Sequence, residues 1–311
     1  MSRPPDPSSV RFPGPWTHRD VSANGIRLHV AEAGSGPLVL LLHGFPEFWW
    51  SWRHQLPALA AAGRHAVAVD LRGYGDSDKP PRGYDLWTLS GDVAGLVRAL
   101  GERHADLVGH DWGGILGWCT AALHPRLVRS VTVLSAPHPL AMGQALLRDP
   151  AQRCASRYLA DFQVPWLPER SLTRDGAAQV ERILRGGAGP QWRASSELTL
   201  AARRYREAML IPGAAHCALE YYRWVGRSQF RFDGRRLSRA VNRAARVPVL
   251  QVHGAEDPYV LEPTARRSVQ WAGNSYRYEV LPRVGHFVQQ EAPEHTTTLI
   301  SAFLRNAREW H

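Results

Sequence analysis

The chain has 311 residues, of which 44% are hydrophobic, and it carries a formal net charge of +10. This length fits one domain with a large insertion or about two domains, and the composition is that of an ordinary globular protein. No apolar run approaches the ~20 residues that span a bilayer, so we expect no integral membrane protein. The first residues are rich in proline and lack the apolar stretch of a signal peptide. We expect residues 1–15 to form a disordered tail.

The positive charge is concentrated in the middle of the chain. Between Arg148 and Arg246 there are 19 arginines against 9 acidic residues, and the rest of the chain is neutral. We interpret this excess mainly as a solvated, arginine-rich surface. The alternative is attraction of anionic substrates, of a membrane surface or of nucleic acid. No nucleic-acid motif accompanies the charge, so nucleic-acid binding is not expected.

Cysteine usage points to a reducing compartment. Cys119, Cys154 and Cys217 form an odd, scattered set without metal-ligand spacing. Such a set predicts a cytoplasmic protein with reduced thiols and no bound metal. The sequence leaves the oligomeric state open, a homo-oligomer included.

Strand-like runs alternate with helical patterns on both sides of the basic segment. Repeated strand–helix units predict an α/β protein with a mostly parallel central sheet and helices on both faces. The alternation stops over residues 138–244, which we expect to be a helical cap domain inserted into a core domain of residues 16–137 and 245–311. Strands are expected at residues 26–31, 37–42, 66–70, 105–108, 128–134, 247–254 and 276–281, and helices at residues 86–100, 115–124, 263–272 and 293–310.

Residues 109–114, which read GHDWGG, lie between an expected strand and an expected helix. A strand, a Gly-x-nucleophile-x-Gly turn and a helix form the turn that exposes a nucleophile in many hydrolases. Its glycines are required because a Cβ beside the nucleophile would clash. The apex here is Asp111. A carboxylate attacks a saturated carbon and forms an alkyl ester, which favours hydrolysis of an epoxide or an alkyl halide over hydrolysis of an ester.

Two loops after late strands supply partners for this aspartate. Asp257 follows the expected strand 247–254, and His286 follows the strand 276–281. His286 would take a proton from water, and Asp257 would orient its ring and stabilise the imidazolium. The backbone N–H of Phe45, in the loop after the strand 37–42, is a candidate donor to an oxyanion near Asp111.

These residues resemble those of the epoxide hydrolase family of the α/β-hydrolase fold. The segments 43–47 (HGFPE), 109–114, 256–257 (ED) and 285–287 (GHF) match its pattern in order. The resemblance implies Asp111 as nucleophile, no cofactor and a lipophilic epoxide as the small-molecule partner. It also implies an oxyanion hole formed by the backbone N–H groups of Phe45 and Trp112, and a cis peptide bond before Pro46. We further expect His43, Pro46, Trp112 and Trp166 to contact the substrate.

The family pattern also places two tyrosines of the cap over the epoxide oxygen. Tyr158, followed by residues 162–165 (FQVP), resembles the first of them. Tyr222 resembles the second, with the adjacent Tyr221 as the alternative. Trp166 is a departure, because relatives commonly have glycine at this position, and we expect its side chain to narrow the substrate tunnel.

Two other functions share parts of this pattern. A haloalkane dehalogenase has the same aspartate turn followed by tryptophan, but its halide site needs a second N–H donor where this chain has Phe45, or a cap tryptophan such as Trp166. A fluoroacetate-type enzyme would need arginines around the turn, where Trp112 and Gly113 stand. A non-catalytic receptor or scaffold of the same fold would not need the complete set of Asp111, Asp257 and His286.

Overall fold

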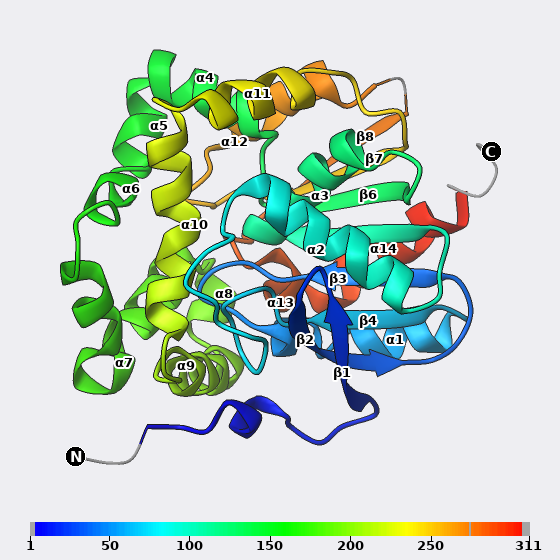
Figure 1. The fold of residues 1–311 in the computed structure, drawn as a ribbon, viewed down its shortest axis with the longest axis horizontal. Helices are drawn as coiled ribbons and strands as arrows, with labels where there is room; N and C mark the ends of the chain where they lie inside the picture. The colour runs from blue at the N-terminus through cyan, green and yellow to red at the C-terminus, as the bar shows by residue number, and fades with distance from the viewer. Residues whose placement is uncertain (1–3, 274, 307–311) are drawn as a thin grey trace.

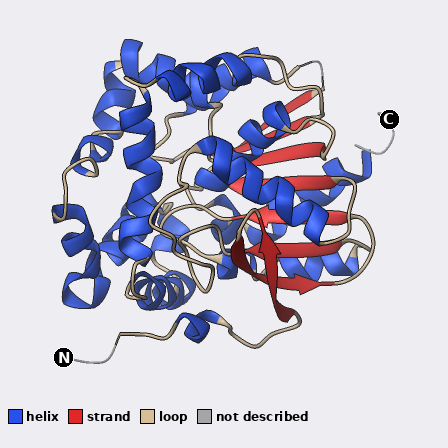
Figure 2. Cartoon of the chain, viewed as in Figure 1, coloured by secondary structure: helices blue, strands red, loops and turns tan. Residues whose placement is uncertain are grey.

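The computed structural model describes residues 4–273 and 275–306. An eight-stranded sheet runs through it with the strand order β1-β2-β4-β3-β5-β6-β7-β8, and helices surround this sheet (Figure 2). The β1–β2 and β2–β4 pairs are antiparallel and all other neighbouring pairs are parallel. The expected mostly parallel sheet is therefore confirmed. The strands are β1 (Thr17–Ala23), β2 (Ile26–Ala33), β3 (Leu38–Leu42), β4 (His65–Val69), β5 (Ala105–His110), β6 (Val128–Leu134), β7 (Val249–Gly254) and β8 (Tyr276–Leu281).

The central strands are apolar on both faces because helices cover both. Every residue of β3 (Leu38–Leu42) is buried, as is every residue of β5 and β7. On one face, α2 (Leu86–Ala99) and α3 (Trp112–Leu123) pack against each other and over the strands; on the other, α1 (Gln55–Ala61) packs against α14 (Pro293–Asn306) (Figure 1). The carboxyl ends of β3, β5 and β7 consequently meet at one edge of the sheet, where βα loops place functional groups.

Between β6 and β7 the chain forms only helices. We call residues 138–244 the cap segment; its helices α5, α6, α7 and α10 lie beside the sheet, at the left in Figure 1. The long helix α7 is broken in its middle, where Asp175, Gly176 and Ala177 all have positive φ angles. The helices of the segment are α4 (Pro139–Arg148), α5 (Pro150–Ala155), α6 (Tyr158–Asp161), α7 (Leu167–Gly187), α8 (Pro190–Arg193), α9 (Ser196–Met209), α10 (Ala214–Ser228) and α11 (Phe232–Val241).

Several elements differ from the sequence-based expectation. Strand β1 was not predicted, because only two of its residues are buried and its pattern is therefore weak. The expected helix 263–272 is divided into α12 (Glu262–Arg266) and the 3-10 helix η3 (Arg267–Trp271). Short helices at η2 (Trp49–Trp52) and α13 (Val288–Glu291) were also unforeseen. The last helix is described to Asn306, and its expected end at residue 310 lies outside the described residues.

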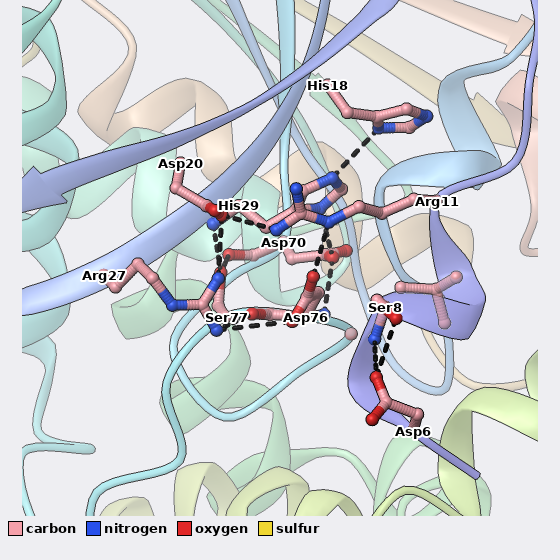
Figure 3. A network of polar contacts seen from close by, with 12 residues as sticks. Asp6, Ser8, Arg11, His18, Asp20, Arg27, His29, Asp70, Asp76 and Ser77 are labelled. Carbon is pink, nitrogen blue, oxygen red and sulfur yellow. Dashed lines mark hydrogen bonds and ion pairs between the residues drawn. The ribbon is translucent and has the colours of Figure 1, made fainter.

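The expectation of a disordered tail is corrected for residues 4–15, which run along the core and past α9 (Figure 1). Val10, in the short 3-10 helix η1 (Pro7–Val10), is 1% exposed, and its carbonyl accepts a hydrogen bond from Trp49. Arg11 forms ion pairs with Asp20 and Asp76 (Figure 3). Proline suits this segment because the chain follows the surface without regular backbone hydrogen bonding. Residues 1–3 lie outside the described part.

Within residues 4–273 and 275–306, no helix combines the length and the apolar character that crossing a membrane requires.

Candidate active site

Asp111 occupies the sharp turn between β5 and α3. Its backbone has φ 50° and ψ −116°, a conformation that is unfavourable for any residue with a side chain. A Cβ at Gly109 would collide with the carbonyl of Gly113, and a Cβ at Gly113 would collide with the carbonyl of Leu42 at the end of β3. The two glycines therefore allow the turn to close, and the turn presents the Asp111 side chain at the edge of the sheet.

The carboxylate of Asp111 lies between the backbone N–H of Phe45 and the ring of His286, both expected from the sequence. Its Oδ1 accepts a hydrogen bond of 3.0 Å from the backbone N–H of Phe45. Its Oδ2 lies 3.7 Å from Nε2 of His286. The peptide bond between Phe45 and Pro46 is cis, as the resemblance to the family implied. Trp112 is the first residue of α3, where the helix leaves backbone N–H groups without intrahelical partners.

His286 is held by Asp257 from the other side. Nδ1 of His286 donates a hydrogen bond of 2.8 Å to Oδ2 of Asp257. The second oxygen of Asp257 accepts from the backbone N–H groups of Tyr259 and Val260, at 2.9 and 3.1 Å. Both carboxylate oxygens are thus satisfied inside the protein, and the ring of His286 is fixed with Nε2 toward Asp111.

The charges of this set shift one another's pKa values. Burial by itself lowers the pKa of His286, but the charge and hydrogen bond of Asp257 and the nearby carboxylate of Asp111 outweigh it and raise that pKa to about 10. Burial opposes ionisation of Asp111 and Asp257, yet the partnership with His286 holds the pKa of each carboxyl below its usual range. The site is therefore an imidazolium between two carboxylates.

A second buried pair lies directly behind the turn. Nδ1 of His110 donates to Glu47 at 2.7 Å and Nε2 donates to the backbone carbonyl of His286 at 2.9 Å. Both ring nitrogens of His110 are therefore engaged by buried oxygen atoms. Glu47 also accepts from the side-chain amides of Gln289 and Gln290. The pair joins the loop after β3 to the loop that carries His286.

A cavity of about 490 Å³ opens over Asp111. Burial, followed by the charge of Asp111, raises the pKa of both Tyr158 and Tyr222 far above neutrality, so each keeps its hydroxyl hydrogen. Their rings meet edge to face at 6.1 Å. Tyr221 lies elsewhere, because its hydroxyl donates to the carbonyl of Arg72 at 2.7 Å. The lining comprises Phe45, Asp111, Tyr158, Asp161, Phe162, Val164, Leu167, Pro168, Ser171, Leu172, Gln179, Arg182, Ile183, Tyr222, Tyr259 and His286.

The four residues expected to contact substrate do not line this cavity. His43 is fully buried and uses its ring nitrogens on the backbone of Gly44 and Leu71. Trp112 packs edge-on against Tyr222. Trp166 is 82% exposed, so it does not narrow the cavity in this structure. It also has a φ of 61°, which explains why glycine is suited to this position.

Sequence reasoning missed other residues of the lining. Tyr259 lies edge-on to His286 at 5.2 Å and donates its hydroxyl to the carbonyl of Ile183 in α7. Phe162 packs against Tyr158 and Tyr222. Tyr259 follows Asp257 by two residues, and the turn that an Asp-Pro pair favours was the available signal for it. Among the described residues, no group of three or more His, Cys, Asp or Glu side chains is arranged to hold a metal ion.

Known proteins share this architecture over most of the chain. Residues 37–293 match a family described as alpha/beta hydrolase fold. The AB hydrolase superfamily protein YfhM of Bacillus subtilis is 34% identical over 290 residues, which are 92% of this chain and 97% of that protein. Epoxide hydrolase A of Mycobacterium tuberculosis is 34% identical over 320 residues, covering 94% of this chain and 98% of that protein. The crystal structure of epoxide hydrolase A from Mycobacterium thermoresistibile superposes with a TM-score of 0.80 at 31% identity, covering 93% and 98% of the two chains.

The sheet, the sharp turn and these matches define an α/β-hydrolase. Within that fold, the chain belongs to the epoxide hydrolase family.

Proposed function

We propose that this protein opens an epoxide with water to give a vicinal diol, through an alkyl ester on Asp111. The observation that carries the proposal is the arrangement around one cavity: a carboxylate at its floor, His286 beside the carboxylate and two tyrosine hydroxyls from the cap segment. A carboxylate nucleophile needs no base for its attack, and an epoxide needs a proton donor for its oxygen. The cavity supplies both.

In the first step, an oxygen of Asp111 forms a bond to a ring carbon as the bond from that carbon to the epoxide oxygen breaks. Tyr158 and Tyr222 hold the epoxide oxygen, and one of them transfers its hydroxyl hydrogen to the alkoxide that forms. The raised pKa of each tyrosine keeps the hydrogen available at neutral pH. The products are a hydroxyalkyl ester of Asp111 and a tyrosinate.

The second step uses an electrostatic change that the first step creates. Esterification removes the negative charge of Asp111, which is one of the groups that raise the pKa of His286. The pKa of His286 then falls, the imidazolium gives its proton to the tyrosinate left by the first step, and the neutral ring becomes a base for water. Hydroxide attacks the ester carbonyl, whose oxyanion is held by the N–H groups of Phe45 and Trp112. The diol leaves, Asp111 retains one oxygen from water, and His286 keeps the proton taken from water, which restores the starting imidazolium.

The lining predicts the general character of the substrate. Phe162, Val164, Leu172 and Ile183 give the cavity apolar walls, which suit a lipophilic epoxide. We also propose a cytoplasmic location, in keeping with free cysteines that include the buried Cys119.

A labelling experiment tests the mechanism, and product analysis tests the reaction. After a single turnover in ¹⁸O-water, the peptide containing Asp111 is expected to carry ¹⁸O. The variant His286→Gln is expected to trap the ester after one burst, visible as added substrate mass on the intact protein. Turnover without label would refute the ester. Halide release from a bromoalkane without diol formation would instead establish a dehalogenase, and neither product from any of these substrates would favour a binding protein.

A further inference from the structure

The open end of the cavity is formed by the turn between α6 and α7. Residues at the floor, such as Asp111 and His286, are enclosed by the protein, whereas Val164 and Leu167 line the cavity and are 42% and 66% exposed. The cavity therefore leads from the proposed reaction centre to this turn. The polar lining residues Asp161, Ser171 and Arg182 are also exposed and lie beside these apolar side chains in the sequence or on α7.

Trp166 stands between these two residues in the sequence. Its side chain is 82% exposed, and within the described part of the chain it forms no hydrogen bond, ring contact or ion contact. Its backbone has a positive φ of 61°, which disfavours every residue except glycine. A large apolar side chain thus occupies a strained position, and no side-chain hydrogen bond or ring contact with the described residues compensates for the strain. Single exposed apolar residues are ordinary, but three adjoining ones at a cavity mouth are not.

Positive charge surrounds the same turn. Arg170 and Arg174 follow Trp166 at intervals of four residues, so in the first half of α7 they lie on one face with it. Arg182, in the second half of α7, lines the cavity. All three guanidinium groups are exposed and form no ion pair among residues 4–273 and 275–306.

The acidic residues of this region do not cancel that charge. Glu169 is already neutralised by Arg223, at 2.6 Å. Asp161 and Asp175 are exposed, so the turn and α7 keep three arginines against two carboxylates. The whole cap segment has the same sign.

We propose that the α6–α7 turn docks on an anionic lipid surface. Tryptophan prefers the boundary between lipid headgroups and acyl chains, where its ring is in an apolar and its N–H in a polar environment. In this arrangement Trp166 and Leu167 enter that boundary and the arginines contact the anionic headgroups. The cavity mouth then faces the phase in which lipophilic molecules are dissolved. This docking does not depend on the reaction proposed above.

The test is sedimentation of the full chain with vesicles, without any epoxide. Vesicles of phosphatidylcholine alone are compared with vesicles that also contain phosphatidylglycerol, at low and high salt. Binding is expected only with phosphatidylglycerol and is expected to weaken with salt. Trp166→Gly should weaken partitioning by on the order of tenfold, and Arg170→Gln with Arg174→Gln by about fivefold for each charge removed.

Matched variants on the core separate docking from general effects. Val269→Ala removes an exposed apolar side chain (51% exposed) from η3, and Arg98→Gln with Arg103→Gln removes two exposed charges near the end of α2. Both should bind vesicles as the parent chain does. Glycine suits the backbone at position 166, so thermal melting should show a folded variant.

Equal binding to both kinds of vesicle, no binding at low salt, or equal losses in the core variants would overturn the proposal. So would a dimer in sedimentation velocity that Trp166→Gly dissolves, because the turn would then contact a second copy of the chain.

Discussion

The core and the cap segment contribute to the cavity in opposite ways. The core supplies ionised groups, Asp111, Asp257 and His286, each fixed by buried hydrogen bonds. The cap segment supplies neutral hydroxyls and apolar walls on helices whose outer faces are exposed and rich in arginine. Charges require a rigid, fully satisfied setting because an unpaired buried charge is costly. Neutral side chains do not require such a setting. The outer surface of the cap segment and the apolar walls that it contributes can therefore differ without disturbing the ionised groups.

This contrast between core and cap segment requires that the core supply the reacting groups. The variant Asp111→Ala is the strongest test of that requirement. Turnover of an epoxide should fall by at least ~10⁴-fold, because the covalent step loses its nucleophile. Asp175→Asn is the matched control: this carboxyl is exposed on the cap segment, and asparagine tolerates its positive φ of 53°. A control that lost activity equally would assign the effect to net charge instead of to the nucleophile.

Glu47→Gln tests the rigidity of the core. The glutamine side chain would place an N–H donor against the groups that donate to Glu47, and it would remove the buried carboxylate that His110 contacts. The free energy of unfolding should drop by about 3–5 kcal/mol, measured by urea denaturation. Glu197→Gln removes a carboxylate that is 51% exposed and pairs with Arg53, and it should cost less than about 1 kcal/mol. Equal losses would show that burial of the pair has no special importance.

The variants Tyr158→Phe and Tyr222→Phe each remove one hydroxyl, and they test the contribution of the cap segment. Each single variant should lose on the order of 10²-fold in kcat, since the other hydroxyl still donates, and the double variant should lose on the order of 10⁴-fold. Tyr221→Phe removes an adjacent hydroxyl that bonds to Arg72 outside the cavity. It should lower the melting temperature slightly while turnover persists. If Tyr221→Phe were the damaging change, the assignment of the second tyrosine would be reversed.

The last prediction concerns stability and pH. The pKa of His286 is raised from its ordinary value of 6.5 to about 10 in the folded chain, so the folded state keeps a proton that the unfolded state releases. The resulting stabilisation is complete below about pH 6.5 and is lost as the pH rises through about 10. In His286→Gln, urea denaturation should show a smaller decline of unfolding free energy across this range. His295→Gln, an exposed histidine of α14, should keep the decline of the parent chain.

Sequence reasoning succeeded where local rules determine the structure. The turn at Asp111 follows from glycine spacing, and the loops of Asp257 and His286 follow from the ends of buried strands. It could not decide between Tyr221 and Tyr222 with certainty, because both faces of α10 are buried at these positions and hydrophobicity does not distinguish them. It also could not foresee that Val10 packs beneath Trp49, since nothing local in a proline-rich segment encodes that contact.

The hydrogen bond between Glu47 and Gln289 joins residues 242 positions apart in the chain. This separation bears on how the chain folds during its synthesis. Glu47 belongs to the first sixth of the sequence and its amide partners belong to the last. Before those partners are synthesised, burying the Glu47 carboxylate would leave it without the hydrogen bonds that Gln289 and Gln290 donate. Burial without these bonds is unfavourable. The first half of the sheet therefore gains little by closing early. We therefore expect a chain that ends before α13 to lack the amides that satisfy this carboxylate, and so to be less well ordered around Asp111 than the full chain.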